Sequence, residues 1–552
     1  MWLCCSLRVT ALLFAALPSG FSSHESTGTE FVTAFLENMA YYHPSPPTHR
    51  LLISALYNRT QVNVTIKEMD FDTSRVLWVG QTEEVALPRW VELGRSNVSS
   101  RTVHVSSSSP VAVLSVNAKG SSIETSVVQP VQNLGTEYFV ASLATPTASS
   151  YRIVIINTQS ANTVKVSHSS SAPPVAVTLG PYQNAQFQIE PPPTATRVTA
   201  DHPVAVLFGH PCIDRTECTC GLVFEQLSPT GSWGTLFIVP PSSSWNNTNQ
   251  LLLLTASEST NLEGVLPSMP FSGSQSSLNS QEVLQLNLAP AGSPFHIKAS
   301  RPVSLMLLNP GLTSFTPEET FSSCHLLHAL SGFSNYALLV VRTAHTDGVG
   351  LGEELLPASV TWTQVDGTEY SQALVPLGSE PMQRVVWHKD SKIGVYNFGE
   401  NTNGTKSYGH PALSLKVEPD GSKCKVGVFE LVQEEKSWSD ALQHCWAASS
   451  QLVSISSPEI QQRVAQALGE ARNSSMAWMG LRRSLLSGAW RWLSRDPVGF
   501  SRWAGGEPGD PLQNQCAAML LEPERNFIWT AKSCCQTLPF ICFQSGSEVP
   551  FP

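Results

Sequence analysis

The chain has 552 residues, of which 14% are charged, and its 43 acidic residues outnumber its 33 basic ones. Because a single hydrophobic core stops growing beyond about 250–300 residues, this length predicts about three or four domains. A net charge of −10, without a run of lysine or arginine, excludes a protein that binds the phosphate backbone of nucleic acids. Catalytic patterns such as G-x-S-x-G, H-E-x-x-H, the P-loop and the dinucleotide fingerprint do not occur, so no catalytic residue and no enzyme is expected.

The start of the chain predicts a secretory signal peptide over residues 1–23. Arg8 precedes an apolar run from Val9 to Leu17, which is too short to span a bilayer, and small residues follow it. An uncleaved signal anchor is the alternative. No other apolar stretch reaches the roughly 18 residues of a spanning helix, and the tail 544–552 resembles neither a membrane anchor nor a GPI signal. The mature protein is therefore expected to be soluble, secreted and without a membrane span.

Other features fit an oxidising, extracellular compartment. Removal of Cys4 and Cys5 with the signal leaves an even number of cysteines, for which disulfides are the default. Four cysteines lie in mid-chain (Cys212, Cys218, Cys220, Cys324) and six near the end (Cys424, Cys445, Cys516, Cys534, Cys535, Cys542). N-x-Ser/Thr triplets predict N-glycosylation at Asn58, Asn63, Asn97, Asn246, Asn403 and Asn473. A metal site at His210 and the neighbouring cysteines is disfavoured against disulfides.

Two sequence landmarks recur four times in the same order. The first starts with a glycine in "GTEFV", "GTEYFV" and "GTLFIV", and is degraded to "SNYALLV" at its fourth occurrence. The second is "PVAVLSVN", "PVAVLFGH", "PVSLMLLN" and the weaker "KIGVYNFG". Apolar residues between them alternate with a period of two, as in Val62/Val64, Val103/Val105 and Val164/Val166, which indicates half-buried strands. The proline of the second landmark suits the first residue of a strand.

The predicted architecture is multidomain and mainly β. Four tandem β-sandwich-like repeats are expected at about 28–120, 134–210, 231–310 and 332–400, followed by a linker at 411–423. With "HPVAVLFGHPC" and "CGLVFEQLSPTGSWGTLFIVP", residues 28–410 resemble the N-terminal region of the IgG Fc-binding mucus protein family. The resemblance implies a secreted, mucosal, non-enzymatic protein and a Cys212–Cys220 disulfide, which leaves Cys218 to pair with Cys324. The von Willebrand D modules of the long family members are missing, which disfavours a gel-forming role.

The residue pattern changes from Cys424 onward. Trp438, Ala441, Leu442 and Cys445 lie on one face of a predicted helix. A second helix is predicted from "SPEIQQRVAQALGE", with Ser457 as N-cap, Pro458 and Glu459 in its first turn, and Ile460, Val464 and Leu468 as its apolar stripe. Short tryptophan-rich segments follow. The set W-x-D-A-x-x-x-C, W-x-G-L, W-x-x-G-E-P and F-I-C makes residues 424–543 resemble an α+β C-type lectin-like domain.

This second resemblance implies further pairings and a possible sugar site. Its disulfides carry over as Cys445–Cys542 and Cys516–Cys534; Cys424 and Cys535 are left over, either for one another or for an interchain bond. In sugar-binding members, one calcium is held by an E-P-N triplet, a later Glu and an Asn-Asp pair. Here these positions are Glu507-Pro508-Gly509, Asn514 and Thr530-Ala531, which lack two of the three carboxylates that a hard cation needs.

The candidate ligand-binding residues are therefore Glu507, Asp510, Asn514 and Trp503, of which Glu507 and Asn514 form a degraded calcium site. Six tryptophans invite stacking on sugar rings, but core packing is the better interpretation, with Trp492 and Trp503 the least certain. The sequence predicts a non-enzymatic recognition or adhesion protein that binds a glycoprotein, a glycan, a mucus component or a microbial surface, without a cofactor and without calcium at the usual site. A calcium-dependent lectin and a structural matrix or mucus protein are the alternatives.

Overall fold

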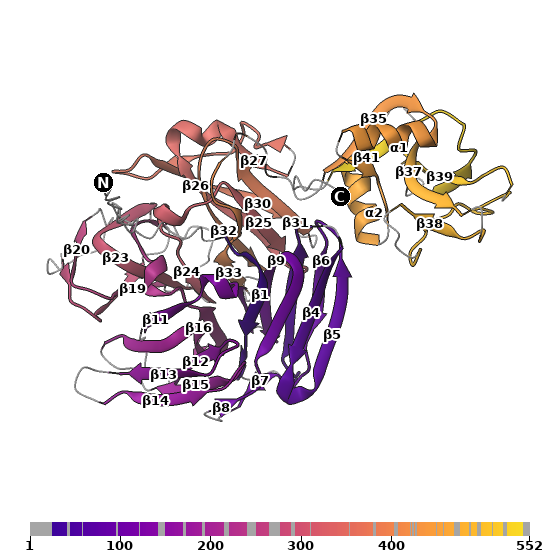
Figure 1. Cartoon of the computed structure of the whole chain (residues 1–552). Helices are drawn as coiled ribbons and strands as arrows, with labels where there is room; N and C mark the ends of the chain where they lie inside the picture. The colour runs from indigo at the N-terminus through magenta and orange to yellow at the C-terminus, as the bar shows by residue number, and fades with distance from the viewer. Residues whose placement is uncertain are drawn as a thin grey trace, which may run out of the picture.

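The computed structural model describes most of the chain. The described residues are 25–40, 45–57, 59–94, 98–120, 122–141, 150–168, 173–189, 194–214, 220–239, 250–263, 277–288, 293–309, 311–352, 354–378, 382–401, 407–419, 421, 424, 428–448, 450–455, 458–468, 475–484, 487–493, 498–510, 512–522 and 527–544. The chain is multidomain and mostly β, as predicted (Figure 1). The predicted signal peptide, and all the predicted glycosylation sites except Asn63, lie outside these residues.

Each of the first three units is built on one long strand. These strands are β9 (Val103–Lys119), β16 (Thr196–Asp214) and β23 (Phe295–Asn309). In the first unit, the first half of β9 pairs with β4 (Thr60–Ile66), and its second half pairs with β3 (Thr48–Ala55). The long strand therefore belongs to both layers of a sandwich-like unit. The alternating valines that predicted these strands are buried.

The proline of the second landmark does not begin a strand, so that expectation was wrong. Pro110, Pro203 and Pro302 lie inside the long strands, where the register against the unit's first strand shifts. At this point the long strand leaves one neighbour and takes the next: β9 pairs with β4 up to Ser107 and with β3 from Val111. A residue between two ladders needs no N–H donor, so proline is tolerated there.

The glycine of the first landmark packs against a proline that follows the last strand of the same unit. A Cβ on Gly28 would lie 2.5 Å from Cβ of Pro130, and on Gly135 it would lie 2.4 Å from Cβ of Pro229. The third unit repeats the contact between Gly234 and Pro317 at 2.3 Å. Because no side chain fits in these gaps, glycine at this landmark closes each of the first three units onto the segment that leaves it.

The first three units share one strand order, to which the second unit adds β8 (Val98–Ser99) at its edge, beside β15. In the first, β1 (Thr27–Thr33) and β10 (Ser122–Val128) pair with β9, while β5 (Phe71–Leu77) and β6 (Thr82–Ala86) lie at the edges. The equivalent strands of the second unit are β11 (Gly135–Val140), β12 (Tyr151–Asn157), β13 (Asn162–Ser167), β14 (Val175–Leu179), β15 (Asn184–Ile189) and β17 (Cys220–Gln226). Those of the third are β18 (Gly234–Val239), β19 (Gln250–Ala256), β20 (Thr260–Glu263), β21 (Ser277–Leu278), β22 (Val283–Leu288) and β24 (Gly311–Ser314).

The fourth unit departs from this plan because its long strand is divided. β31 (Met382–His388) and β32 (Gly394–Glu400) take the places of the two halves, and the unit consists of two five-stranded sheets. One sheet contains β25 (Cys324–Ala329), β27 (Val349–Leu351), β28 (Glu354–Leu355) and β34 (Leu413–Lys416). The other contains β26 (Ser334–Arg342), β29 (Thr363–Gln364), β30 (Tyr370–Gly378) and β33 (Ser407–Pro411).

The strand pairing corrects the predicted ends of the repeats. The last strand of each unit, β10, β17, β24 and β33, lies beyond the predicted limits at residues 120, 210, 310 and 400. The fourth unit also begins earlier than predicted, since β25 precedes residue 332 and pairs with β31. These strands carry neither landmark, so the repeat pattern does not reveal them.

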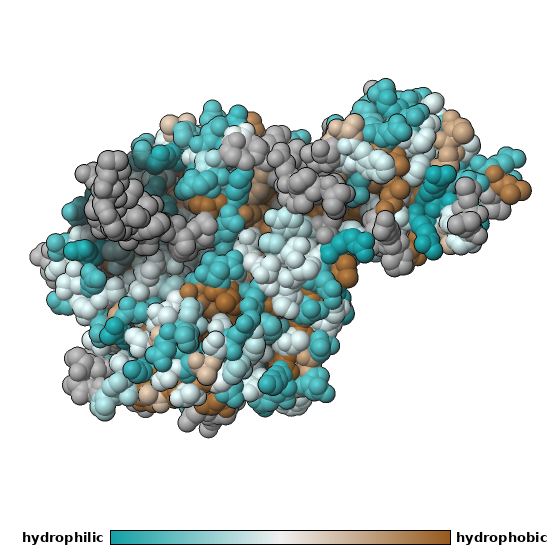
Figure 2. All heavy atoms as spheres, in the orientation of Figure 1, coloured by the Kyte–Doolittle hydropathy of each residue, from teal (hydrophilic) through white to brown (hydrophobic). Residues whose placement is uncertain are grey.

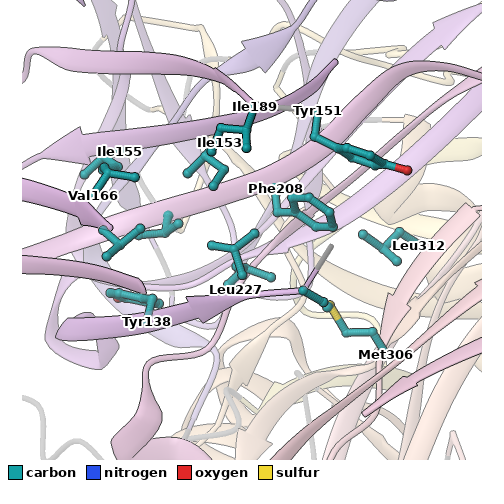
Figure 3. Packing of buried hydrophobic residues seen from close by; sticks show 14 of the residues in the cluster. Tyr138, Tyr151, Ile153, Ile155, Val166, Ile189, Phe208, Leu227, Met306 and Leu312 are labelled. Atoms are coloured by element: carbon teal, nitrogen blue, oxygen red, sulfur yellow. The ribbon is translucent and has the colours of Figure 1, made fainter. Parts of the chain in front are cut away.

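The four last strands contact one another and close the units into a ring. Figure 1 shows two of them, β24 and β33, at the centre of the β region. β10 contacts β17 and β33, and β24 contacts the same two strands from the other side. Neighbouring units also share hydrophobic clusters. In the cluster drawn in Figure 3, Met306 and Leu312 of the third unit pack with Tyr151 and Phe208 of the second. A further cluster joins the first unit to the fourth, through residues such as Leu114 and Leu326.

Hydrogen bonds between buried side chains also join the first unit to the fourth. We call the boundary between these two units the seam. Ser54 Oγ lies 2.8 Å from Nε2 of His328, and Thr125 Oγ1 lies 2.8 Å from Nδ1 of His410. Ser26 N–H donates to the carbonyl of Ser414 at 2.8 Å. Burial lowers the pKa of His328 to about 4 and that of His410 to about 3, the latter with help from the like charge of His328. Both imidazoles are therefore neutral at physiological pH.

Two disulfides lie in or beside the β region. Cys212–Cys220 is present, as the family resemblance implied, at the hairpin of β16 and β17. Cys324 pairs with Cys424, so the expected pairs Cys218–Cys324 and Cys424–Cys535 were wrong. Cys218 lies outside the described residues, and Cys535 is exposed with a free thiol. The Cys324–Cys424 bond attaches the segment after the fourth unit to the first strand of that unit.

Substitution Gly135→Ala is expected to destabilise the protein by roughly 1–3 kcal/mol, because the added methyl overlaps Pro229 and forces a shift of backbone or ring. The matched control is Gly231→Ala, two residues after Pro229, where nothing lies within 4 Å of an added Cβ. Denaturant unfolding of the full chain measures both. A cost for Gly231→Ala equal to that for Gly135→Ala would show that the Gly–Pro contact does not close the unit.

Stability is expected to fall as the pH is lowered from about 6.5 to about 4. Buried His325, His328 and His410 have pKa values of about 4, 4 and 3, below their ordinary value of 6.5, so in this window only the unfolded chain takes up their protons. Glu225 acts in the opposite direction, since burial raises its pKa to about 8. The three histidines lower the free energy of unfolding in this window and Glu225 alone raises it, so the net change is a loss of stability. Denaturation midpoints measured at several pH values test this, and a midpoint that is constant or rises between pH 6.5 and 4.5 contradicts it.

Candidate functional site

The C-terminal domain contains a small sheet in which the first and last strands of the domain pair with each other. β35 (Val428–Lys436) pairs with β41 (Leu538–Gln544), and β37 (Met476–Arg483) lies between β41 and β39 (Cys516–Leu520). β36 (Gln451–Leu452), β38 (Trp490–Trp492) and β40 (Trp529–Lys532) complete the sheet. The disulfides Cys445–Cys542 and Cys516–Cys534 are those that the resemblance implied.

Both predicted helices are confirmed. α1 (Trp438–Ala447) begins after Ser437, whose side chain accepts from the backbone N–H of Asp440. α2 (Pro458–Ala467) begins at the predicted proline, while Ser457 lies outside the described residues. The apolar residues of each helix face the sheet: Trp438, Ala441 and Cys445 are buried in the first, and Ile460, Val464 and Leu468 in or just after the second.

The tryptophans belong mainly to the core. Trp438, Trp478, Trp492 and Trp529 are at most 2% exposed, which leaves no ring face for a sugar. Trp503 is half-buried, and its ring packs at 4.9 Å from that of Trp490 and at 5.8 Å from that of Trp529. Trp492 therefore lies in the core, and Trp503 remains beside the candidate loop with part of its surface free.

Glu507 is the centre of the candidate site, and three donors of the chain already engage its carboxylate. The N–H of Gly509 donates to Oε2 at 2.8 Å, the hydroxyl of Thr530 donates to Oε1 at 2.8 Å, and the N–H of Ala531 donates to Oε2 at 3.3 Å. The peptide bond between Glu507 and Pro508 is cis. Burial raises the pKa of the Glu507 carboxyl, but these hydrogen bonds and the charge of Lys532 outweigh it, and the pKa lies below its ordinary value.

The other predicted residues lie around this carboxylate but do not all turn toward it. A Cβ on Gly509 would lie 3.7 Å from Oε2 of Glu507 and 3.8 Å from Nδ2 of Asn514, so Asn514 flanks the same position. Asp510 is exposed, and its Oδ1 accepts from the N–H of Leu512 at 2.8 Å. Its carbonyl accepts from the N–H of Asn514 at 3.0 Å. Asp510 thus shapes the loop that connects Glu507 to Asn514.

These residues do not fit the calcium site of a sugar-binding C-type lectin. Calcium takes about six to eight oxygen ligands, several of them anionic. Here the one carboxylate at the centre is occupied by chain donors, and two of those donors, Thr530 and Ala531, stand at the positions of the usual Asn-Asp pair. Within the described residues, no group of three or more His, Cys, Asp or Glu side chains is placed to hold a metal ion.

The C-terminal domain is docked on the first unit by a contact that the sequence did not suggest. Trp78 and Val79 form the turn between β5 and β6 and join the hydrophobic cluster of the C-terminal domain, together with residues such as Val453 and Ile455. Gly80, with φ of +71°, is the third residue of this turn, the position at which a type II turn needs glycine. Val79 is 2% exposed. Figure 1 shows this end of the first unit beside α2.

The candidate loop lies on another side of the domain. β39, which follows the loop directly, is on the side away from the β units in Figure 1. Leu512 in this loop is 85% exposed, and Trp446 at the end of α1 is 63% exposed. Figure 2 shows hydrophobic residues in small, separate groups among polar ones on the face drawn, without a continuous apolar patch. In the part of the chain that is described, no helix is long and apolar enough to cross a membrane.

Comparisons with known proteins agree with this division of the chain. The family described as "IgGFc binding protein" matches residues 124–399, and the family "Lectin C-type domain" matches residues 434–544. Human IgGFc-binding protein is 30% identical over 442 residues, which cover 73% of this chain and 8% of that protein. Human C-type lectin domain family 17, member A is 36% identical over 107 residues, which cover 19% of this chain and 26% of that protein.

A third relative, the secretory phospholipase A2 receptor of Pongo abelii, is 29% identical over 130 residues, 23% of this chain and 9% of the receptor. The chain thus corresponds to a small part of each of these relatives. The first family model covers the second and third units and most of the fourth, the second model covers the small sheet domain, and neither family is one of enzymes. The chain belongs to the IgGFc-binding protein family and carries a C-type lectin domain after the repeats.

Proposed function

We propose that this protein is a secreted, non-enzymatic recognition protein whose C-type lectin domain binds an extracellular glycoprotein, mucus component or microbial surface without calcium at the usual sugar site. The observation that carries the proposal is the state of Glu507. Its carboxylate is the only charged ligand of the family's calcium site that this chain keeps. It accepts hydrogen bonds from Gly509, Thr530 and Ala531. A calcium ion would have to displace these donors and find few other anionic ligands.

The docked position of the domain supports a role in presentation. The turn at Trp78 and Val79 packs against the domain, and the Cys324–Cys424 disulfide ties the segment before the domain to the fourth unit. They leave the loop with Glu507, Asn514 and exposed Leu512 free for a partner. The ring serves as a rigid support, and the partner is recognised by the outer surface of the loop and by the free part of Trp503.

The proposal predicts that ligand binding by the full chain is independent of calcium. The protein is applied to a glycan array that also carries mucus glycoproteins and immobilised IgG Fc, the ligand in the name of the human relative, in calcium and in excess chelator. Equal signals in both buffers, reduced by Asn514→Ala or Trp503→Ala but not by Asp201→Asn on the second unit, are expected. Signals that disappear with chelator contradict the proposal.

Restoring the missing ligands is expected to create the calcium site. The variant combines Gly509→Asn, Asn514→Glu, Thr530→Asn and Ala531→Asp; the space around Gly509 admits a side chain at ordinary contact distances. Calorimetric titration should show no calcium binding by the natural chain at millimolar concentration, whereas the variant should bind calcium with a dissociation constant at least about tenfold below 1 mM.

The control for this titration is the same variant with Glu507→Gln, which should lose the gain. Thermal midpoints without calcium show whether each variant is folded. Submillimolar calcium binding by the natural chain that disappears in Glu507→Gln would refute the account of the loop.

A further inference from the structure

The hairpin of β37 and β38 places two arginines directly opposite each other. Arg482 and Arg491 are partners in this antiparallel ladder, so their side chains leave the same face of the sheet. Their neighbours Leu481 and Trp492 point to the other face and are buried. Both arginines are exposed. Because like charges that face each other across two strands repel, this pair lowers the stability of the hairpin.

The same register adds a third cation to this face. Arg482 also pairs with Cys516 of β39, and Cys516 pairs with Lys532 of β40. Arg491, Arg482 and Lys532 therefore lie in one row across four neighbouring strands, with the buried Cys516 between the second cation and the third. We call these three residues the basic row. Figure 1 shows two of the four strands, β38 and β39, on the side of the domain away from the β units.

The basic row lacks carboxylates of the chain that would neutralise it. Within the described residues, none of its three cations forms an ion pair. Glu434 pairs with Lys436 instead, at 2.6 Å, and the carboxylate of Glu507 is engaged by donors of its own loop. Residues 424–543 contain as many acidic as basic side chains. A row of one sign on a domain without net charge indicates an anionic partner.

Arg482 is held in position for such a partner. Its guanidinium lies over the ring of Trp438, 5.4 Å from the centroid, and this ring is buried under it. A cation–π contact of this kind orients the guanidinium plane and uses none of its N–H donors. Arg483 differs, because its Nε donates to the carbonyl of Gly488 at 2.7 Å and so belongs to the hairpin itself.

Two opposed guanidinium groups favour a tetrahedral oxyanion. Residues directly opposite in an antiparallel pair have Cβ atoms about 4.5–5.5 Å apart, so Arg482 and Arg491 can both reach one group. A sulfate ester has three terminal oxygens and can accept from two arginine forks at once, whereas one fork already occupies both oxygens of a carboxylate. Sulfate esters are the tetrahedral oxyanions that extracellular glycans carry.

We propose that the basic row binds sulfated extracellular glycans, with one sulfate ester held between Arg482 and Arg491, and with Lys532 extending the positive surface along the glycan. The proposal names a class of ligand for the lectin domain. It rests on the function proposed above only in that this domain recognises glycans. The loop with Glu507 has no part in it, so the two proposals can fail separately.

Binding of the full chain to immobilised glycans tests the proposal. The probes are N-acetyllactosamine, its 6-O-sulfated form and its 3′-sialylated form, with a heparin hexasaccharide as a second sulfated ligand. The sulfated probes should bind at least about tenfold more tightly than the unmodified and sialylated ones. Their binding should weaken as salt is added, because salt screens exposed charges.

Arg482→Gln and Arg491→Gln should each weaken binding of the sulfated probes at least about tenfold. Arg482→Lys keeps the charge but not the fork, so it should restore only part of the loss. Because the opposed charges repel, Arg491→Gln is expected to leave the thermal midpoint equal or higher, which shows that the variant is folded. Arg89→Gln removes the same charge from an exposed residue of the first unit and is the matched control. Asn514→Ala is the control for the loop; both should bind as the natural chain does.

Three results would overturn the proposal: equal binding of the sulfated and unmodified probes, equal binding of the sulfated and sialylated probes, or the same loss in Arg89→Gln as in Arg491→Gln. Binding of unmodified glycans that is lost in Asn514→Ala and kept in Arg491→Gln would refute this inference alone. If no glycan binds in any buffer, the glycan recognition assumed for the domain fails with it.

Discussion

The seam between the first and fourth units is the constraint on which the β region depends. Ser54 and His328 are 274 residues apart in the chain, and their side chains meet at 2.8 Å inside the protein. This contact, with those of Thr125 to His410 and Ser26 to Ser414, turns a tandem array into a closed ring. A tandem array would leave the hydrophobic side of its first and last units exposed, whereas the ring buries both in a shared cluster.

Closure also explains the unusual state of the groups at the centre. The last strand of each unit has a neighbour on either side, so its polar side chains have to pair with one another away from water. His410 stays neutral there, Glu225 stays protonated at neutral pH, and His328 of β25 stays neutral at the seam. The central position follows from the topology, since each of these strands forms a hairpin with the second half of the long strand of its unit.

The sequence predicted those features that are encoded locally. The alternating valines predicted the strands, the helix faces followed from spacing, and three disulfides followed from resemblance. The first landmark marks the first strand of the first three units, but its fourth occurrence lies in β26, after β25, which begins the fourth unit. The sequence did not predict that Pro110 lies inside a long strand, because the change of partner at that point is a property of the assembled sheet.

The Cys324–Cys424 bond crosses from one domain type to the other, so dividing the cysteines into two groups hid it. The departures from the usual calcium ligands at Gly509, Asn514, Thr530 and Ala531 can be read from the sequence, but the donors to Glu507 include two backbone N–H groups, which no side chain reveals.

Closure of the ring is the central claim, and native-state hydrogen exchange of the full chain, read by mass spectrometry on peptides from β10, β17, β24 and β33, tests it most directly. In a closed ring the four central strands open together, so their amides should exchange with one common free energy, close to that of global unfolding. The substitution Ser54→Ala, at the seam, should lower that value for all four strands alike. Separate free energies for β10 and β33, with Ser54→Ala affecting only the first unit, would contradict the account.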